Sequence, residues 1–314
     1  MSNKNQDPRK ANPDFPIYNG KNACKIYKDL SDKVIVITGS SNGVGKSTAR
    51  LLAFMGPTII FACRDEAKTL PVIQEIQQET KNKKLEFIRL DLSDLQSVRD
   101  FAKEFNSRHK KLDILINNAG INMPDRRKTK DGFELVFGTN HLGHFYLTEL
   151  LLDALKRAAP SRILNVSSGL HESAKMKWDD LMFEKNFSML DSYKQSKLAN
   201  VMFTKELQRR VAKDNIKVVC LCPGLIGTDL NRDLKTSKWY HRLMVWALKP
   251  FQKSLLEGGQ NSLYCALEDA EKLDDGGYYR DCKRAKENPL SKDEANCKRL
   301  WDISEKLISE KIKN

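Results

Sequence analysis

The sequence predicts an α/β fold in which a doubly wound parallel sheet forms a single domain. Short apolar runs of strand length alternate with helical patterns along most of the chain. Each strand run is continuously apolar, as expected for strands that helices cover on both faces. The first run ends in a glycine-rich turn that leads directly into a helix. Alternation of this kind predicts parallel strands joined by right-handed crossovers.

The helical pattern is clearest at Leu95–His109, where Val98, Phe101, Ala102 and Phe105 follow i, i+3, i+4, i+7 spacing. The strand runs are short and close with turn residues or charged residues. The predicted strands are Val34–Thr38, Thr58–Ala62, Glu86–Leu90, Ile114–Ile116, Arg162–Val166 and Val218–Leu221, and the other predicted helices are Gly45–Met55 and Glu66–Thr80.

Composition and charge exclude several classes of protein. Of the 314 residues, 40% are apolar, which is enough for a sizeable core. The 54 basic residues exceed the 41 acidic residues by 13, but they are scattered and form no nucleic-acid motif. We therefore expect a basic solvated surface and no nucleic-acid partner. The seven cysteines show no zinc-ligand spacing, which predicts no metal site and a reducing compartment.

The sequence shows no transmembrane segment and no signal peptide. Its longest apolar candidate, Trp239–Phe251, is interrupted by charged residues and falls short of the roughly 20 residues of a membrane span. Residues 1–20 are polar and lack the apolar core of a signal peptide. We expect an intracellular protein, cytoplasmic or organelle-associated. Peripheral membrane contact, a homo-oligomer and membership of a larger assembly stay open.

The first strand leads into the run Thr38–Gly45, whose glycine spacing is G-x-x-x-G-x-G. Glycine permits a tight turn and the close approach of a pyrophosphate to the N–H groups of the next helix, so the turn predicts a Rossmann-type dinucleotide site. The alternative is a P-loop ending in Gly45-Lys46-Ser47, but Ser40 stands where that motif needs a glycine. The candidate cofactor-binding residues here are Gly39, Ser41, Asn42, Gly43, Val44 and Gly45.

The end of the second strand indicates which dinucleotide is bound. An acidic residue usually holds the ribose 2′-hydroxyl at this point, but here the neutral Cys63 is followed by Arg64. A guanidinium pairs well with a 2′-phosphate, which favours NADP(H) over NAD(H). The alternative is that Arg64 is merely solvated. After the third strand, Asp91 is within reach of the adenine, and Leu92 beside it is a further candidate cofactor-binding residue.

Tyr193 and Lys197 are four residues apart, so on a helix they share one face. A phenol with a pKa near 10 is a poor acid–base group at neutral pH, but a nearby ammonium lowers that pKa. Such a tyrosine can give a proton to a carbonyl oxygen as hydride arrives, or take one from an alcohol. The spacing is common by chance, so its meaning depends on the residues around it.

Polar residues follow the strands at the edge where open α/β sheets bind ligands. Ser168 comes after the fifth strand, where its hydroxyl can hold a substrate oxygen. Asn118, Ala119 and Gly120 come directly after the fourth strand, and Asn140 lies further along the chain. His141 and His144 lack an evident third metal ligand and are expected to pack, whereas His171 either packs or touches substrate.

Taken together and in this order, these motifs resemble the short-chain dehydrogenase/reductase superfamily. The finer resemblance is to its retinol dehydrogenase-like branch and covers roughly Leu30–Ile308. The superfamily motifs are Thr38–Gly45, Asn117–Gly120, Asn140, Ser168, Tyr193 with Lys197, and Pro223-Gly224 with Thr228. The branch-like runs are Ala62–Asp65, Asn165–His171, Glu257–Gln260, Gly277–Cys282 and Arg299–Trp301.

The resemblance implies a role for each of these residues. Tyr193 is then the general acid/base, and Lys197 lowers its pKa and holds the nicotinamide ribose. Ser168 binds the substrate oxygen, and Asn140 supports a proton relay to Lys197 through water. The segment from Pro223 and Gly224 to Thr228 is then in contact with the nicotinamide end of the cofactor.

These observations predict an NADP(H)-dependent oxidoreductase that interconverts an aldehyde or ketone with an alcohol, on a lipophilic or retinoid-like substrate. The alternative is a Rossmann-fold subunit that serves a larger assembly as a structural component with bound cofactor. We expect an N-terminal extension at 1–31, the dinucleotide-binding domain at 32–290 with a substrate lid at 231–257, and a C-terminal helix at 291–314 packed on the domain. Trp239–Phe251 is core or lid, with a membrane-facing patch as the third option.

Overall fold

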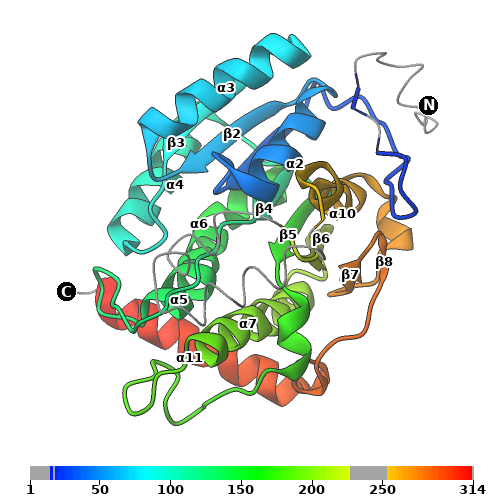
Figure 1. Ribbon diagram of the computed structural model, residues 1–314. Coiled ribbons are helices and arrows are strands. Elements are labelled where there is room, and N and C mark those ends of the chain that lie inside the picture. Colours follow the sequence, from blue (N-terminus) through cyan, green and yellow to red (C-terminus); the bar gives the residue numbers. More distant parts are fainter. Residues whose placement is uncertain (1–14, 17, 227–252, 313–314) are drawn as a thin grey trace.

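The computed structural model describes residues 15–16, 18–226 and 253–312. Its centre is an eight-stranded sheet in the order β3-β2-β1-β4-β5-β6-β7-β8 (Figure 1). All neighbouring strands are parallel except β7 and β8, which are antiparallel. The strands are β1 (Val34–Thr38), β2 (Thr58–Cys63), β3 (Leu85–Arg89), β4 (Ile114–Asn117), β5 (Ser161–Val166), β6 (Ile216–Cys222), β7 (Tyr278–Arg280) and β8 (Lys283–Arg284).

Helices connect the parallel strands and cover the sheet on both faces (Figure 1). The α-helices are α2 (Gly43–Ala53), α3 (Glu66–Thr80), α4 (Leu95–Arg108), α5 (Leu135–Phe137), α6 (Gly143–Arg157), α7 (Met189–Arg210), α10 (Leu255–Leu267) and α11 (Glu294–Ile312). A π-helical turn, η1 (Gly138–Leu142), joins α5 to α6, and short 3₁₀ turns lie at η2 (Gly169–Ser173), η5 (Ala270–Lys272) and η6 (Pro289–Lys292).

The two faces of the sheet carry separate cores because successive strand residues point in opposite directions. On β1, Ile35 and Ile37 pack with α2, α3 and α10, whereas Val36 packs with α4, α6 and α7. These strand residues are fully buried, which explains why the sequence shows continuous apolar runs instead of alternation. The strand order reverses between β1 and β4, and ligands bind at the carboxyl ends of the strands beside such a point.

The structure confirms the predicted fold class and corrects it at one edge. β1 and α3 have the predicted bounds, and the other predicted strands and helices shift by one or two residues at their ends. β7 and β8, which are three and two residues long, were not predicted. The sheet is therefore not wholly parallel. A strand as short as β8 carries no periodicity that a sequence can display, and only its pairing with Tyr279 and Arg280 defines it.

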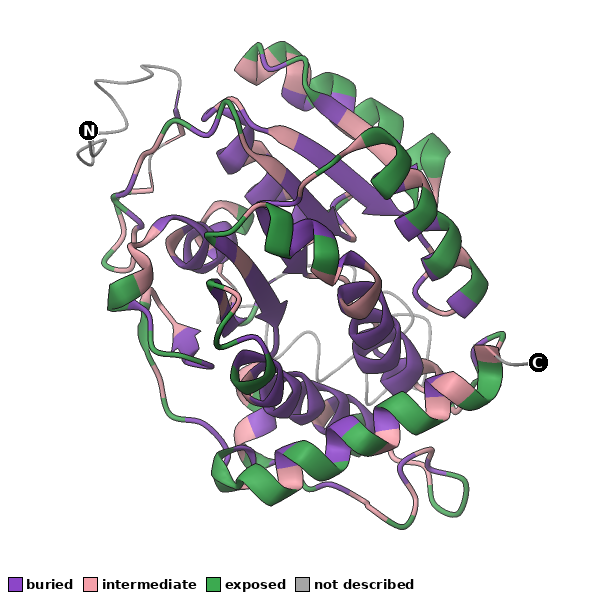
Figure 2. Ribbon diagram, turned by 180° about the vertical axis from the view of Figure 1, so that it is seen from behind, coloured by how far each residue is buried: buried purple, intermediate pink, exposed green. Residues whose placement is uncertain are grey.

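Both ends of the described chain pack on this framework. Residues 15–16 and 18–31 contain no helix or strand, and Phe15 sits edge-on against Tyr27 and Phe54. At the other end, α11 lies along α7 and turns its apolar face inward (Figure 2). Trp301 of α11 packs against Phe145 and Phe203. In the described part of the chain, no helix combines the length and apolarity needed to cross a bilayer. Residues 231–252 of the predicted lid, with Trp239–Phe251, lie outside it.

Two consecutive glycines bring α10 close to α2, the helix that follows the glycine turn. A Cβ atom on Gly259 would lie 2.9 Å from both Leu51 Cδ1 and Ser47 Oγ. We expect Gly259→Val to lower the free energy of unfolding by about 2 kcal/mol, because overpacking displaces these side chains. Urea denaturation measures this effect. Valine has a higher helix propensity than glycine, so a loss at Gly259 cannot come from propensity. Gln78→Val at an exposed position of α3 shows the effect of a helical valine without overpacking, and an equal loss in both variants would contradict the packing argument.

Candidate active site

The glycine turn lies between β1 and the N-terminus of α2. Gly39 and Gly43 have φ angles of +64° and +56°, a left-handed conformation that favours glycine. A Cβ atom on Gly45 would lie 2.5 Å from the carbonyl oxygen of Gly39 and 2.5 Å from Asn118 Nδ2. Side chains here would therefore close the turn, and their absence leaves the helix N-terminus open to a pyrophosphate. Lys46, the lysine of the P-loop alternative, points away and pairs with Glu75 of α3 at 2.8 Å.

Thr38, the last residue of β1, holds the segment after β4 in place. Its hydroxyl oxygen accepts hydrogen bonds from the backbone N–H groups of Asn118 and Ala119, both at 2.9 Å. The third partner is His144 Nε2 at 2.9 Å, while His144 Nδ1 lies 3.0 Å from the carbonyl oxygen of Asn140. Because a carbonyl only accepts, Nδ1 carries the proton and Nε2 accepts from Thr38. Burial lowers the pKa of His144 to about 4, which keeps it neutral.

The residue predicted to choose the dinucleotide, Arg64, follows β2, and the residues predicted to lie near the adenine follow β3. Arg64 is exposed directly after β2, the strand that pairs with β1 at the glycine turn. The Asp91 carboxylate closes its own turn by accepting from the backbone N–H and hydroxyl of Ser93, at 3.0 and 2.6 Å. Leu92 is buried, and its carbonyl oxygen faces Gly143 at the start of α6.

Tyr193 and Lys197 share one face of α7, as their spacing predicts. The Lys197 ammonium nitrogen lies 5.7 Å from the centre of the Tyr193 ring and donates to the carbonyl oxygen of Val166 at 3.1 Å. A Cβ atom on Gly120 would lie 3.2 Å from the same nitrogen, so the glycine leaves room for the lysine. Lys197 is only 3% exposed, and burial lowers its pKa to about 8.

Ser168 and Tyr193 are brought together at the carboxyl end of β5. Burial raises the pKa of the Tyr193 phenol, with a further increase from the Cys222 thiol, while a hydrogen bond with the Ser168 side chain lowers it. The Ser168 hydroxyl also accepts from the backbone N–H of Leu170 at 3.3 Å, which caps the η2 turn. A protonated phenol, a hydroxyl and an ammonium therefore occupy one corner of the sheet.

Asn140 lies in the π-helical turn η1, a feature that is frequent at functional sites and that periodicity alone does not reveal. It is fully buried. Its Oδ1 accepts from the backbone N–H of Ile121 at 2.8 Å, and its Nδ2 donates to the Ile121 carbonyl and to Ser196 Oγ, both at 3.0 Å. Asn140 thus ties the segment after β4 to α7, between Tyr193 and Lys197.

The motif after β6 lies beside the same corner. Gly224 has a φ of +94°, and a Cβ atom there would lie 2.8 Å from Lys253 Cδ. Pro223 precedes it and is partly exposed. Next to it, Ile226 forms a parallel bridge with Lys253, and the backbone N–H of Lys253 donates to Leu225 at 2.8 Å. Thr228 lies outside the described residues.

Sequence reasoning missed Glu134, a fully buried carboxylate close to the predicted site. It accepts from the backbone N–H groups of Val136 and Phe137 at 3.0 and 2.8 Å, and from the Ser192 hydroxyl at 3.1 Å. The carboxylate therefore joins the turn that carries Asn140 to the helix that carries Tyr193. An acidic residue directly before a short apolar helix was the available signal, because carboxylates cap helix N-termini.

His141 and His144, which were predicted to pack, are buried, and so is His171, for which packing and substrate contact were both left open. His141 Nε2 contacts Ser304 Oγ of α11 at 2.9 Å, and burial lowers the His141 pKa to about 3. His171 packs its ring against Tyr278, with centroids 4.5 Å apart, and its Nδ1 lies 2.6 Å from the Ser168 carbonyl oxygen. Across the described residues, no group of histidine, cysteine or acidic side chains could hold a metal ion.

Comparison with known proteins decides the family. A model described as short chain dehydrogenase matches residues 33–239. Human retinol dehydrogenase 12 is 43% identical over 286 residues, which cover 91% of this chain and 89% of that protein. The chain belongs to the short-chain dehydrogenase family. Within that family it belongs to the retinol dehydrogenase-like branch, because human retinol dehydrogenase 11 is also 41% identical over 91% of this chain and 88% of its own length.

Solved structures agree with this assignment. An uncharacterized protein from Mycobacterium paratuberculosis is 34% identical and superposes with a TM-score of 0.73, covering 90% of this chain and 95% of its own. The fold is also shared with RhlG of Pseudomonas aeruginosa, which was solved as an NADP active-site complex. The two chains superpose with a TM-score of 0.64 at 22% identity, over 80% of this chain and 95% of RhlG. This short-chain dehydrogenase is therefore an oxidoreductase of a family that binds a nicotinamide cofactor and acts on small molecules.

Proposed function

We propose that this short-chain dehydrogenase is an NADP(H)-dependent enzyme that interconverts an aldehyde or ketone with an alcohol. The observation that carries the proposal is the meeting of the Tyr193 phenol, the Ser168 hydroxyl and the Lys197 ammonium at the carboxyl edge of the sheet. The open glycine turn lies at the same edge, after β1. A proton donor and an open dinucleotide cradle at one sheet edge match the needs of hydride transfer to a carbonyl carbon.

The cofactor, when bound, supplies or accepts the hydride. The chain's own residues handle the proton and the oxygen. Burial raises the pKa of Tyr193, so the phenol holds its proton at neutral pH, contrary to the lowering expected from Lys197. The phenol can donate this proton to the oxygen of a carbonyl substrate as hydride transfer makes that oxygen basic. The Ser168 hydroxyl can hydrogen-bond the same oxygen. The Lys197 ammonium offsets the negative charge left on the phenolate, which also makes the reverse step from an alcohol accessible.

The residues that would hold the cofactor fit a dinucleotide. The turn from Gly39 to Gly45 and the N-terminus of α2 would hold the pyrophosphate, and Arg64 would bind a 2′-phosphate. Asp91 and Leu92 would contact the adenine, and Lys197 and Tyr193 would contact the nicotinamide ribose. Further contacts come from residues on the neighbouring strand ends, namely Asn118, Ala119, Gly120, Pro223, Gly224 and Thr228.

The substrate is proposed to be lipophilic. The relatives at 41–43% identity are named retinol dehydrogenases, which indicates an apolar alcohol or aldehyde. Two large apolar side chains near the site are solvent-exposed, Leu170 in η2 at 41% and Leu225 after Gly224 at 38%. A structural subunit has no evident use for a buried ammonium beside a buried phenol, because burying a charge is costly. The scaffold alternative is therefore not favoured.

The test is a fluorescence titration with NADPH and NADH, followed by an NADPH-consumption screen over aldehydes and ketones of increasing apolar size. We expect tighter binding of NADPH and turnover of the apolar carbonyls. Binding without turnover of any carbonyl, and without oxidation of any matching alcohol by NADP⁺, would contradict the enzymatic proposal. Preferential binding of NADH would contradict the assignment of Arg64.

Arg64 offers a direct test of cofactor choice. We expect Arg64→Ala to weaken NADPH binding by about tenfold, because a charge-assisted bond to the 2′-phosphate contributes about 1.5 kcal/mol. NADH lacks this phosphate, so its dissociation constant should change by less than about twofold. Arg99→Ala, at an exposed arginine of α4, is the control for a general loss of positive charge. An equal weakening of both dinucleotides by Arg64→Ala would show that Arg64 does not read the phosphate.

A further inference from the structure

The turn that follows Ser168 is held by a segment far away in the sequence. Asn288 precedes η6 and is 4% exposed. Its Nδ2 lies 2.9 Å from the carbonyl oxygen of His171, 3.2 Å from that of Glu172 and 2.9 Å from that of Ala174. Its Oδ1 accepts from the backbone N–H of Leu290 at 2.9 Å. The Asn288 side chain therefore donates to the backbone of η2 and of the residue after it, and it accepts from the backbone of its own segment.

Strand β7, which lies shortly before Asn288 in the chain, makes two further contacts with η2. Arg280 of β7 forms an ion pair with Glu172, with 2.7 Å between Nη1 and Oε1. The His171 ring packs edge-on against Tyr278 of β7, and its Nδ1 donates to the carbonyl oxygen of Ser168. A continuous path of contacts therefore runs from Asn288 through His171 to the backbone of Ser168.

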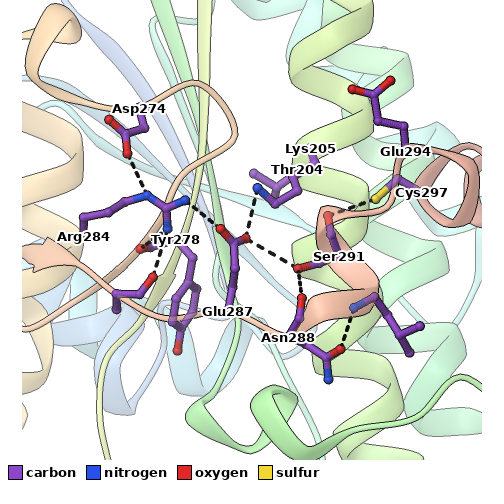
Figure 3. Close-up of polar contacts among 12 residues, drawn as sticks. Thr204, Lys205, Asp274, Tyr278, Arg284, Glu287, Asn288, Ser291, Glu294 and Cys297 are labelled. Atoms are coloured by element: carbon purple, nitrogen blue, oxygen red, sulfur yellow. Dashed lines mark hydrogen bonds and ion pairs between the residues drawn. The ribbon is translucent and has the colours of Figure 1, made fainter.

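The segment that carries Asn288 is itself fixed to α7 (Figure 3). The Glu287 carboxylate is 4% exposed and lies 2.6 Å from Arg284 Nη2 and 3.0 Å from Lys205 Nζ. Lys205 stands eight residues after Lys197 on α7. The Glu287 side chain is buried, whereas its two cationic partners are partly exposed. Loss of either cation would leave the buried carboxylate less compensated, which favours keeping both contacts. Asn288 is thus held relative to the helix that carries Tyr193.

We propose that Asn288 is a positioning residue that holds Ser168 against Tyr193 by donating hydrogen bonds to the backbone carbonyls of η2. The inference rests on the proposed function for its effect on turnover, but the contacts themselves do not depend on it. Without the amide donors, the buried carbonyls of His171 and Ala174 and the part-buried carbonyl of Glu172 each lose a partner. The η2 turn can then shift the Ser168 hydroxyl away from the phenol. A misplacement of about 1 Å at a reacting centre can lower the rate by about 100-fold.

Two variants separate the amide donors from the acceptor. Asn288→Asp keeps an oxygen for the Leu290 N–H but places a carboxylate against three carbonyl oxygens. Asn288→Ser keeps a capping oxygen without adding a charge, so it covers the case in which the aspartate variant fails to fold. Asn106→Asp, on the exposed surface of α4, makes the same chemical change away from the site and serves as the control.

Hydrogen exchange tests the hydrogen bonds from Asn288 to η2 without any need for enzyme activity. The amides of His171 and Ala174 are bonded within the turn, to the carbonyls of Ser168 and His171. In both Asn288 variants we expect peptides covering 168–174 to exchange at least about tenfold faster than in the unmodified chain, with α4 unchanged. Equal exchange in this segment would overturn the proposal whether or not the protein turns over carbonyls.

A double-mutant cycle tests whether Asn288 acts through Ser168. We expect Asn288→Ser to lower kcat by about tenfold or more, with the dissociation constant of NADPH within about twofold and Asn106→Asp unchanged. In a Ser168→Ala background, the same substitution should lower kcat by less than about twofold, because the group it positions is gone. The proposal would be overturned if Asn288→Ser lowered kcat by the same factor in both backgrounds. It would also be overturned if Asn288→Ser weakened NADPH binding in parallel with kcat. Absence of turnover in the unmodified chain would instead count against the proposed function.

Discussion

Replacing Tyr193 with phenylalanine is expected to lower kcat for carbonyl reduction by about 1,000-fold, with little change in NADPH binding. General acid catalysis by one positioned group contributes about 10²–10⁴-fold, and Tyr193 is the phenol beside Ser168. Phenylalanine keeps the ring that packs with Met123 and Val136, so the fold should be retained. Steady-state kinetics on an active aldehyde and a fluorescence titration with NADPH measure the two quantities.

Tyr146→Phe provides a matched control for the Tyr193 experiment. Tyr146 has the same 6% exposure but packs with the core on the α4, α6 and α7 face of the sheet. Its hydroxyl should be dispensable, so kcat should stay within about twofold. If Tyr193→Phe retained more than about a tenth of the original kcat, another group would have to deliver the proton, and the assigned role of Tyr193 would be wrong.

Lys197→Met is expected to have two opposite effects, a loss of about 1,000-fold in kcat/KM and a gain in stability. Burial lowers the pKa of Lys197 from an ordinary value of 10.5 to about 8. Below pH 8 the folded chain therefore carries a buried charge, at a cost of about 3 kcal/mol. Methionine removes this cost, and the Val166 carbonyl keeps its second donor, Asn200 Nδ2 at 3.2 Å. The free energy of unfolding without cofactor should rise by about 3 kcal/mol at pH 7.

The pH dependence gives the Lys197 prediction its sharpest check. Between pH 8 and pH 10.5 the unfolded chain binds more protons at this lysine than the folded chain does. The unmodified protein should therefore gain stability relative to Lys197→Met as the pH rises through this window, until the two approach each other. Urea denaturation at pH 7 and pH 10 measures the difference. A variant that is less stable than the unmodified chain at pH 7 would show that the ammonium is well accommodated.

Much of the fold could be predicted from local patterns. The helix at Leu95–Arg108 is visible because burial on one side leaves a period in the sequence, and the strand at Val34–Thr38 because burial on both sides leaves a continuous apolar run. The spacing of Tyr193 and Lys197 places them on one face of a helix, but only the other motifs in the chain made that spacing meaningful. The glycine turn was predictable because few other residues adopt a positive φ.

The unpredicted parts depend on contacts that span long stretches of chain. Asn288 and His171 are 117 residues apart, and nothing in either local sequence indicates the other. Glu134 gains its position from Ser192, and the π-helical turn at Asn140 depends on packing across α5, α6 and α7. A single sequence reports local preference, whereas these features arise when the sheet and its helices come together.

The strand order has a consequence for how the sheet can be made as the chain is synthesised. β2 and β3 add in turn to one side of β1, and then β4, β5, β6, β7 and β8 add in turn to the other side. Every new strand therefore meets an edge that is already present and free, and none has to insert between two paired neighbours. A ribosome that releases residues from the N-terminus onward delivers each strand in the order in which the growing edge can accept it.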